Sequence, residues 1–242
     1  MLEGLVAWFL NTYVGEYVEN LNTDQLSIGL LQGEVELENL PLKKDALKYL
    51  GLPIEIVAGF IGKIRLHIPI YRLRSEPWVI NIEGLYLVAG KVSNNEYNEE
   101  KEEQAAQTRK LSRLDVLEAK WKAEFERQDE SSSYYAHSYL SWLSYGTSLM
   151  SNIIENLQLN IKDIHIRYED SFSQGNTSFA CGIVIQQLSA QSTDEYWIPK
   201  FVIKDKVNVM CKLLEIGGLG IYWNTDVELI GHLPIHELTL LK

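Results

Sequence analysis

The sequence is short of the features that mark several classes of protein. Its 242 residues contain two cysteines, Cys181 and Cys211, which are too few for a disulfide framework. We expect both side chains to be buried as small hydrophobic groups, in a protein of a reducing compartment. The 22 Lys and Arg are outnumbered by 33 Asp and Glu, which argues against nucleic acid as a partner because it requires a basic surface. No apolar run reaches the roughly 18 residues of a membrane span, and no basic leader precedes Lys43. We therefore expect a cytosolic protein.

Motifs for catalysis and metal binding are missing as well. There is no nucleophile elbow, phosphate-cradling glycine loop or Cys/His cluster. Glu169 and Asp170 have no third partner at a fixed spacing, so we expect a solvated strand end there rather than an acid–base pair. His232 and His236 stand four apart, but Pro234 between them indicates a loop or strand rather than a helix face with two metal ligands. We expect no catalytic residue, no metal and no cofactor, and hence no enzyme.

Residues 1–20 have the apolar spacing of an amphipathic helix. The side chains that define its apolar side are Leu2, Leu5, Val6, Phe9 and Tyr13. Packing into a core is the ordinary role of such a helix. The functional alternatives are a cap over an apolar opening and a helix that touches a membrane surface.

Between Gln25 and Gly90 the apolar period changes to two, which predicts strands. The chain is expected to turn in a hairpin at Gln32–Gly33, and residues 41–52 are expected to form a short helix ended by Gly51 and Pro53.

Two further helices are expected in the middle of the chain. Residues 96–130 carry 18 charged side chains in 35 positions, which predicts a long solvated helix, and residues 134–156 predict a second one. Strands return at 157–170, 178–191 and 211–223. This order predicts an α+β fold in which an N-terminal helix and a curved, mostly antiparallel sheet form a hydrophobic groove, with helices on the outside.

One strand pattern recurs with a change of phase in its middle. Apolar residues occupy positions 0, 2, 5 and 7 of VELENLPL (35–42), LNIKDIHI (159–166) and LEIGGLGI (214–221), with looser copies at 80–87 and 183–190. A two-residue slip turns the later pair to the other face unless one extra residue is absorbed. We expect a β-bulge at each slip, which would curve the sheet into an apolar trough. The alternative is two shorter strands that meet at a corner, with apolar residues on both sides.

If bulges absorb the slips, one face of the sheet collects the apolar residues. That face is too large for two amphipathic helices to hide comfortably, so a hydrophobic ligand is expected on it. The expected inward set is Val35, Leu37, Leu40, Ile64, Leu66, Ile68, Ile80, Ile82, Leu85, Leu87, Leu159, Ile161, Ile164, Ile166, Ile183, Ile185, Leu188, Leu214, Ile216, Leu219 and Ile221.

The same stretches resemble a known family. Residues 1–47, GFIGKIRLHIPIY (59–71) and PWVINIEGLYLVAG (77–90) are similar to the N-terminal chorein domain of the vacuolar protein sorting-associated protein 13 family and of related autophagy proteins. NLQLNIKDIHIRYED (156–170) and residues 179–197 and 218–226 resemble the extended part of that region. Within the family, LEGLVAW (2–8) and residues 21–47 are most similar to the D-type branch.

The resemblance implies a division into residues 1–110 as the chorein domain, 111–156 as a helical segment and 157–242 as an extension of the groove. It also implies non-enzymatic transfer of glycerophospholipids between organelle membranes through that groove. The implied partners are glycerophospholipids, the membrane surface at the endoplasmic reticulum, and integral membrane proteins there; the implied location is contact sites of the endoplasmic reticulum with mitochondria or other organelles. The alternative is a structural or tethering module with a closed core.

Overall fold

The computed structural model describes the sheet of this protein and short segments around it. The described residues are 33–48, 52–73, 75–92, 152–172, 177–202 and 210–238, together with 6, 9–11, 13–19, 21, 107–108 and 111. The chain divides into two compact units, Met1–Val92 with Ile153–Lys242, and Ser93–Asn152. The first unit contains the whole sheet, and the second contributes four described residues. The predicted helices at 96–130 and 134–156 lie almost entirely outside the described residues.

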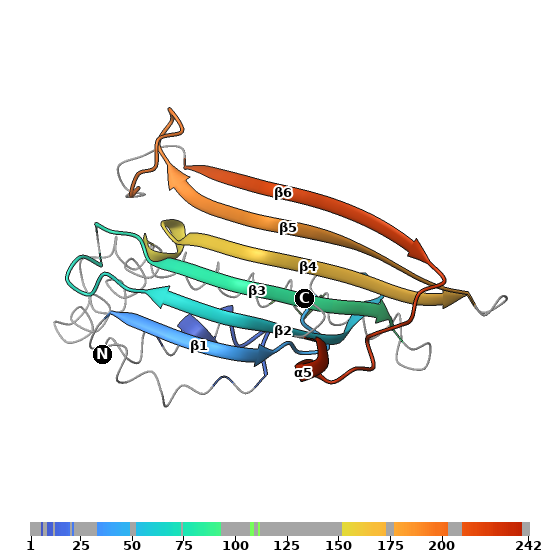
Figure 1. Ribbon diagram of the computed structural model, residues 1–242. Coiled ribbons are helices and arrows are strands. Elements are labelled where there is room, and N and C mark those ends of the chain that lie inside the picture. The colour runs from blue at the N-terminus through green and yellow to red at the C-terminus, as the bar shows by residue number, and fades with distance from the viewer. Residues whose placement is uncertain are drawn as a thin grey trace. The chain divides into compact units, whose positions relative to one another are not determined.

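Six strands form one mixed sheet in which sequence order is spatial order (Figure 1). The strands are β1 (Glu34–Pro41), β2 (Ile54–His67), β3 (Val79–Lys91), β4 (Gln158–Phe172), β5 (Thr177–Thr193) and β6 (Cys211–Thr225). Neighbouring strands are antiparallel except for β3 and β4, which are parallel. The sheet therefore consists of two three-stranded meanders side by side. The strands curve along their length, and the predicted α+β class with a curved, mostly antiparallel sheet is confirmed.

The phase slips of all six strands fall at the same level of the sheet. The pairing runs from Glu38↔Lys63 directly to Leu40↔Ile61 and from Lys162↔Gln187 to Ile164↔Ile185, so one residue is skipped on both strands of each pair. The skipped residues make a transverse row across the sheet, which we call the crease. It consists of Asn39, Gly62, Gly84, Asp163, Gln186 and Gly218.

The crease corrects the prediction of bulges between neighbouring strands. A bulge opposes two residues to one and shifts the register, but the register is unchanged across the crease. The register shift in β2 lies elsewhere, between Ile56 and Ala58. Each strand gains its extra residue opposite the extra residue of its neighbour. The apolar residues on either side of the slip therefore stay on one face, as the bulges were expected to achieve.

Strand direction decides how the crease is made. Asn39, Gly84, Asp163 and Gly218 have φ between 53° and 73°, and they belong to β1, β3, β4 and β6, which all run in the same direction. Gly62 and Gln186 belong to the two strands that run the opposite way, and neither has a positive φ. Glycine, asparagine and aspartate tolerate the left-handed region best. The sequence thus supplies glycine, asparagine or aspartate at every left-handed position of the crease.

The N-terminal helix is shorter than predicted. Helical geometry is described as far as Tyr13, and turns follow from Val14 to Tyr17. Val18 then forms an isolated β-bridge with Leu42, and the Lys43 N–H donates to the Tyr17 carbonyl at 2.9 Å. These backbone bonds replace the helical ones, which is why the helix ends before residue 20.

Two other short elements differ from the sequence-based expectation. Residues 44–47 form turns rather than a regular helix, because Ile56 donates to the Lys44 carbonyl and the chain enters β2. Residues Ile235–Leu238 form a short helix, α5, where a loop or strand was expected. The first arm of the predicted hairpin at Gln32–Gly33 lies outside the described residues, and β1 begins directly after Gly33.

We predict that Gly218, at a left-handed position of the crease, cannot take a Cβ atom without loss of stability. Gly218→Ala should lower the free energy of unfolding by about 1–2 kcal/mol because alanine pays that much in the left-handed region. Gly220→Ala on the same strand is the matched control, since an added Cβ meets no atom within 4 Å there. Urea denaturation measures both, and equal effects of the two substitutions would contradict the role of the crease.

Candidate functional site: the apolar face

The apolar residues on one face of the sheet form four transverse rows, two on each side of the crease. Directly paired residues share a face, so the register alone assigns the rows. They are Val35–Leu66–Ile80–Leu159–Ala190–Leu214, Leu37–Ile64–Ile82–Ile161–Leu188–Ile216, Leu40–Ile61–Leu85–Ile164–Ile185–Leu219 and Gly59–Leu87–Ile166–Ile183–Ile221. Of the expected inward set, every member except Ile68 lies in these rows; Ile68 follows the end of β2 and is buried.

Exposure on this face increases from β1 to β6. The row members on β1 and most of those on β2 and β3 are buried, and those on β4 are mostly half-buried. On β6 the large apolar side chains are all more than half exposed, with Ile221 at 76%. These are Leu214, Ile216, Leu219, Ile221 and Trp223. A stripe of five large apolar side chains in contact with water is unusual for a soluble surface and marks an interaction site.

Protein segments cover the buried part of the face at both ends. At one end Phe9 of the N-terminal helix packs edge-on against Trp78, with ring centroids 5.3 Å apart, and neither side chain has exposed surface. At the other end Ala46 packs in a cluster with Ile56 and Leu87. The apolar face is therefore covered over β1 and β2, half-covered at Ile82 and Leu85 of β3, and open over β5–β6.

The N-terminal helix has side chains of two kinds. Val6 and Phe9 are fully buried, so capping is the role that these two can serve. Tyr13 is partly exposed, and the centroid of its ring lies 5.0 Å from that of Phe9. Leu2 and Leu5 lie outside the described residues. That the helix caps a lipid-binding surface stays a prediction.

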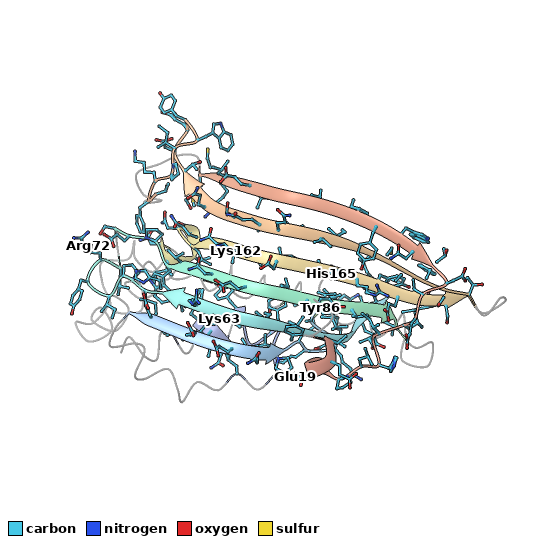
Figure 2. All side chains as sticks on the ribbon, in the orientation of Figure 1. Glu19, Lys63, Arg72, Tyr86, Lys162 and His165 are labelled. Atoms are coloured by element: carbon cyan, nitrogen blue, oxygen red, sulfur yellow. The ribbon has the colours of Figure 1, made fainter. Side chains whose placement is uncertain are left out.

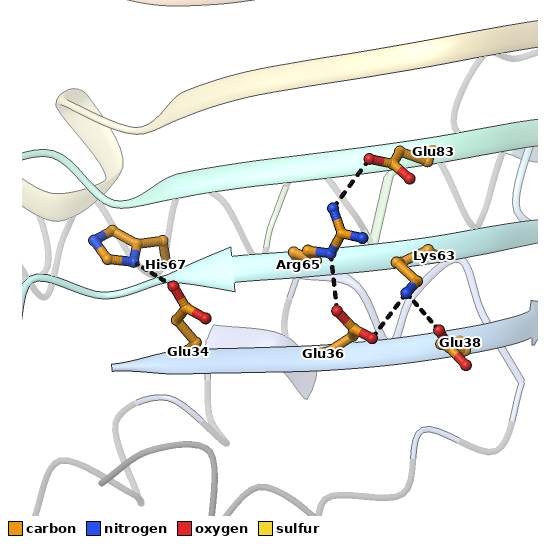
Figure 3. Close-up of polar contacts among 7 residues, drawn as sticks. All are labelled: Glu34, Glu36, Glu38, Lys63, Arg65, His67 and Glu83. Carbon is orange, nitrogen blue, oxygen red and sulfur yellow. Dashed lines mark hydrogen bonds and ion pairs between the residues drawn. The ribbon is translucent and has the colours of Figure 1, made fainter. Parts of the chain in front are cut away.

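The opposite face of the sheet is polar near its first strands. Lys63 bridges Glu36 and Glu38 at 2.8 and 2.6 Å, and Arg65 bridges Glu36 and Glu83 at 2.8 and 3.1 Å (Figure 3). The hydrogen bond from Lys63, followed by that from Arg65, lowers the pKa of Glu36. These pairs are exposed and contribute little stability. Their consequence is that this face is charged and wet where the apolar face is buried.

A cluster of rings occupies the polar face farther along the sheet. His165 lies between Tyr86 and Tyr222, with ring centroids at 5.0 and 5.7 Å, and its Nε2 is 2.8 Å from the Tyr222 hydroxyl. Tyr86 and His165 lie next to each other in Figure 2. Burial, with a smaller contribution from Arg167, lowers the pKa of His165. His165 is half-buried in this cluster.

Glu169 is a structural anchor, and the prediction of a solvated strand end at this residue is wrong. Its side chain is buried and accepts hydrogen bonds from Arg167 Nε at 2.7 Å, from the Ile230 N–H at 3.0 Å and from the Gly231 N–H at 3.0 Å. These bonds hold the segment before α5 against the polar face. Leu238 of α5 then packs there with Phe60, Tyr86 and Val88.

No metal or catalytic constellation is assembled in the part of the chain that the structure describes. No group of three or more His, Cys, Asp or Glu side chains in that part lies within reach of one metal ion. Among the described helices, none has both the length and the apolarity to cross a bilayer.

These observations define a class of protein: an open, curved sheet with a single continuous apolar face that its own segments cover only in part. The sequence profile of the VPS13-like family N-terminal region matches residues 1–240. The chain belongs to this family, as its sequence motifs predict.

Curated relatives match nearly the whole chain. Human intermembrane lipid transfer protein VPS13D is 47% identical over 98% of the chain, and Drosophila melanogaster Vps13D is 45% identical over 93%. Chaetomium thermophilum VPS13, also named an intermembrane lipid transfer protein, is 38% identical over 96%. The resemblance to the D-type branch is confirmed. The chain spans only 5%, 6% and 7% of the length of these relatives.

We predict that Glu169→Gln releases the C-terminal segment from the polar face. The substitution removes the charge and leaves Arg167 without its carboxylate, which should cost about 2–4 kcal/mol of stability. Hydrogen exchange should rise over residues 228–238. Asp170→Asn is the control, because Asp170 contacts Tyr168 and Ser171 and not this segment; unchanged exchange in the Glu169 variant would refute the anchor.

The lowered pKa of His165 predicts loss of stability in acid. Below the ordinary value of 6.5 the unfolded chain binds the proton first, so the contribution of His165 is complete above pH 6.5 and is lost as the pH falls toward the lower pKa of the folded state. His165→Phe should therefore narrow the difference in unfolding free energy between about pH 7.5 and pH 5. An unchanged difference in the His165 variant would contradict the assignment.

Proposed function

We propose that this chain binds the acyl chains of glycerophospholipids on its apolar face and forms the first segment of a bridge that transfers them between organelle membranes, without enzymatic chemistry. The observation that carries the proposal is the exposed apolar stripe on β6, which continues the buried rows of β1–β3 without a change of face. The names of the relatives, intermembrane lipid transfer proteins, support the same function.

The expected lipid-binding set divides into two parts. Its members on β1 and β2 are buried, together with Ile80 and Leu87 of β3 and Ile164 of β4, so we assign them to the closed wall of the groove. The half-buried and exposed members, which are Ile82 and Leu85 of β3 and all those on β4–β6 except Ile164, would contact the acyl chains directly. Apart from the crease, the rows hold no side chain with a formal charge, so a lipid would find a smooth lining.

The size of the barrier explains why such a lining suffices. Exposing one methylene group to water costs about 0.8 kcal/mol, so a two-chain lipid with roughly 30 methylenes meets a barrier on the order of 20 kcal/mol when it leaves a bilayer. An apolar face removes most of that barrier while the headgroup stays in water. Transfer then needs no covalent step, and weak, uniform contacts favour movement over trapping.

The cellular setting follows the resemblance to the family. We propose that the chain acts as a peripheral protein at contact sites of the endoplasmic reticulum with mitochondria or other organelles, in pathways that include autophagy. The Phe9–Trp78 end would face the endoplasmic reticulum membrane and integral membrane proteins there. The division into residues 1–110, 111–156 and 157–242 is kept as the proposed functional division.

The second candidate is a tethering module whose apolar face is a closed core. The burial of β1–β3 favours it for that half of the sheet. The exposed side chains of β6 favour lipid binding for the other half, and one substitution distinguishes the two.

We predict that Ile221→Asp abolishes lipid binding and leaves the fold intact. The side chain is 76% exposed, so the substitution should hardly change the melting temperature, whereas a carboxylate against an acyl chain should lower bound phospholipid by about tenfold or more. Native mass spectrometry of the purified protein measures co-purifying phospholipid.

Asn224→Asp is the matched control, because it adds the same charge to the opposite face of β6. It should retain the phospholipid of the parent chain. Parent protein that carries no phospholipid, or equal occupancy in the two variants, would refute the proposed function.

A further inference from the structure

The connection between β5 and β6 presents three consecutive large side chains to solvent. Tyr196 is 73% exposed, and Trp197 and Ile198 are each 59% exposed. We call these three residues the aromatic tip. Figure 1 shows this connection extending away from the ends of the two strands. Three such neighbours in water gain nothing for the fold, because they bury little apolar area within it.

Hydrogen bonds hold the turn that carries the aromatic tip. Asp194 Oδ1 accepts the N–H of Tyr196 at 3.0 Å and that of Ile198 at 3.1 Å. The main chain of Asp194 also bonds to its partners, since its N–H donates to the Ile198 carbonyl and its carbonyl accepts from Trp197, at 3.0 and 3.1 Å. The bridge Thr193↔Pro199 closes the base. One aspartate thus holds the backbone that displays the tip.

Trp197 occupies a backbone position that does not suit it. Its φ is 63°, in the left-handed region where glycine or asparagine is preferred and where a bulky residue is an outlier. Such strain is kept where the side chain serves a role outside the fold. Because the indole is largely exposed and not packed into the core, that role is an external contact.

The tip lies at the end of the sheet where β3 and β4 begin, which we call the Trp78 end. β5 ends at Thr193 opposite Cys211, the first residue of β6. The connection between β2 and β3 leaves from the same end, and it carries Tyr71, which is 99% exposed. Two separate loops therefore place exposed aromatic residues at the Trp78 end of the sheet.

The chemistry of these side chains fits a bilayer surface. Tyrosine and tryptophan join an apolar ring to a polar group and concentrate at the boundary between headgroups and acyl chains. Of the exposed charged residues beside the tip, Glu195 is acidic and Lys200 is basic, so charge does not direct the tip to anionic lipid.

We propose that the aromatic tip, with Tyr71, inserts into the interface of a zwitterionic bilayer and sets the Trp78 end of the apolar face against the membrane. The choice of a membrane over a protein partner rests on the proposed function. The contact itself requires only that the tip partition into the headgroup region.

Flotation of the chain with phosphatidylcholine vesicles tests the proposal. The combined variant Tyr196→Ser, Trp197→Gly and Ile198→Ser keeps the backbone turn, and glycine relieves the left-handed strain. Vesicle binding should fall on the order of a hundredfold, which corresponds to losing partial burial of three large side chains. Leu52→Ser is the control, because Leu52 is an exposed apolar residue at the opposite end of the sheet, and it should float like the parent.

A second measurement does not depend on the folding of that variant. Tyr196→Cys in a background without Cys181 and Cys211, labelled with an environment-sensitive fluorophore, should shift to shorter wavelength when the vesicles are added. Equal flotation of tip variant and parent, no shift of the label, or a parent that does not float would overturn the proposal, and the last result would leave a protein as the partner.

Phospholipid occupancy of the same samples separates this proposal from the proposed function. Loss of flotation with occupancy retained supports the tip as the membrane contact. Tip-dependent flotation of a parent that carries no phospholipid would also support the contact, while refuting lipid binding on the apolar face.

Discussion

The alignment of the crease across all six strands is the constraint on which the rest of the structure depends. A side chain changes face with every residue of a strand, so one extra residue in one strand would reverse its apolar pattern relative to its neighbours. Here every strand carries the extra residue at the same level, and the hydrogen-bonded register continues on both sides. The apolar face is continuous because the irregularity is shared.

The two faces of the sheet are finished in different ways. On the polar face, ion pairs join side chains of β1–β3, and the buried carboxylate of Glu169 holds the segment before α5 in place. On the apolar face, the N-terminal residues and the turn near Ala46 cover the first strands. The last strands have no such cover among the described residues, so exposure rises toward β6. The apolar face is thus covered at its first strands and exposed at its last one.

Much of the sheet could be predicted from the sequence, because alternation within one strand is a local signal. The pattern 0, 2, 5, 7 marked five of the six strands and the residues that share their apolar face. Strand β2, which has Gly59 at the first position of the pattern, was predicted from alternation alone. The pattern could not show that the slips are aligned, since that depends on the register between strands. The role of Glu169 was missed for a related reason: its partners are main-chain N–H groups 61 and 62 residues away, and no side-chain motif marks them. The end of the first helix was misplaced because Val18 pairs with Leu42.

The parallel pairing of β3 with β4 has a mechanical consequence for the chain between them. Because both strands run in the same direction, Lys91 and Gln158 lie near opposite ends of the sheet. The 66 residues between them, 92–157, must therefore span the length of the sheet back to the start of β4. A fully extended chain covers the length of the 13-residue strand β3 with about as many residues. The connection is therefore more than fifty residues longer than the return requires, and this excess length is enough for Ser93–Asn152 to form a compact unit of its own.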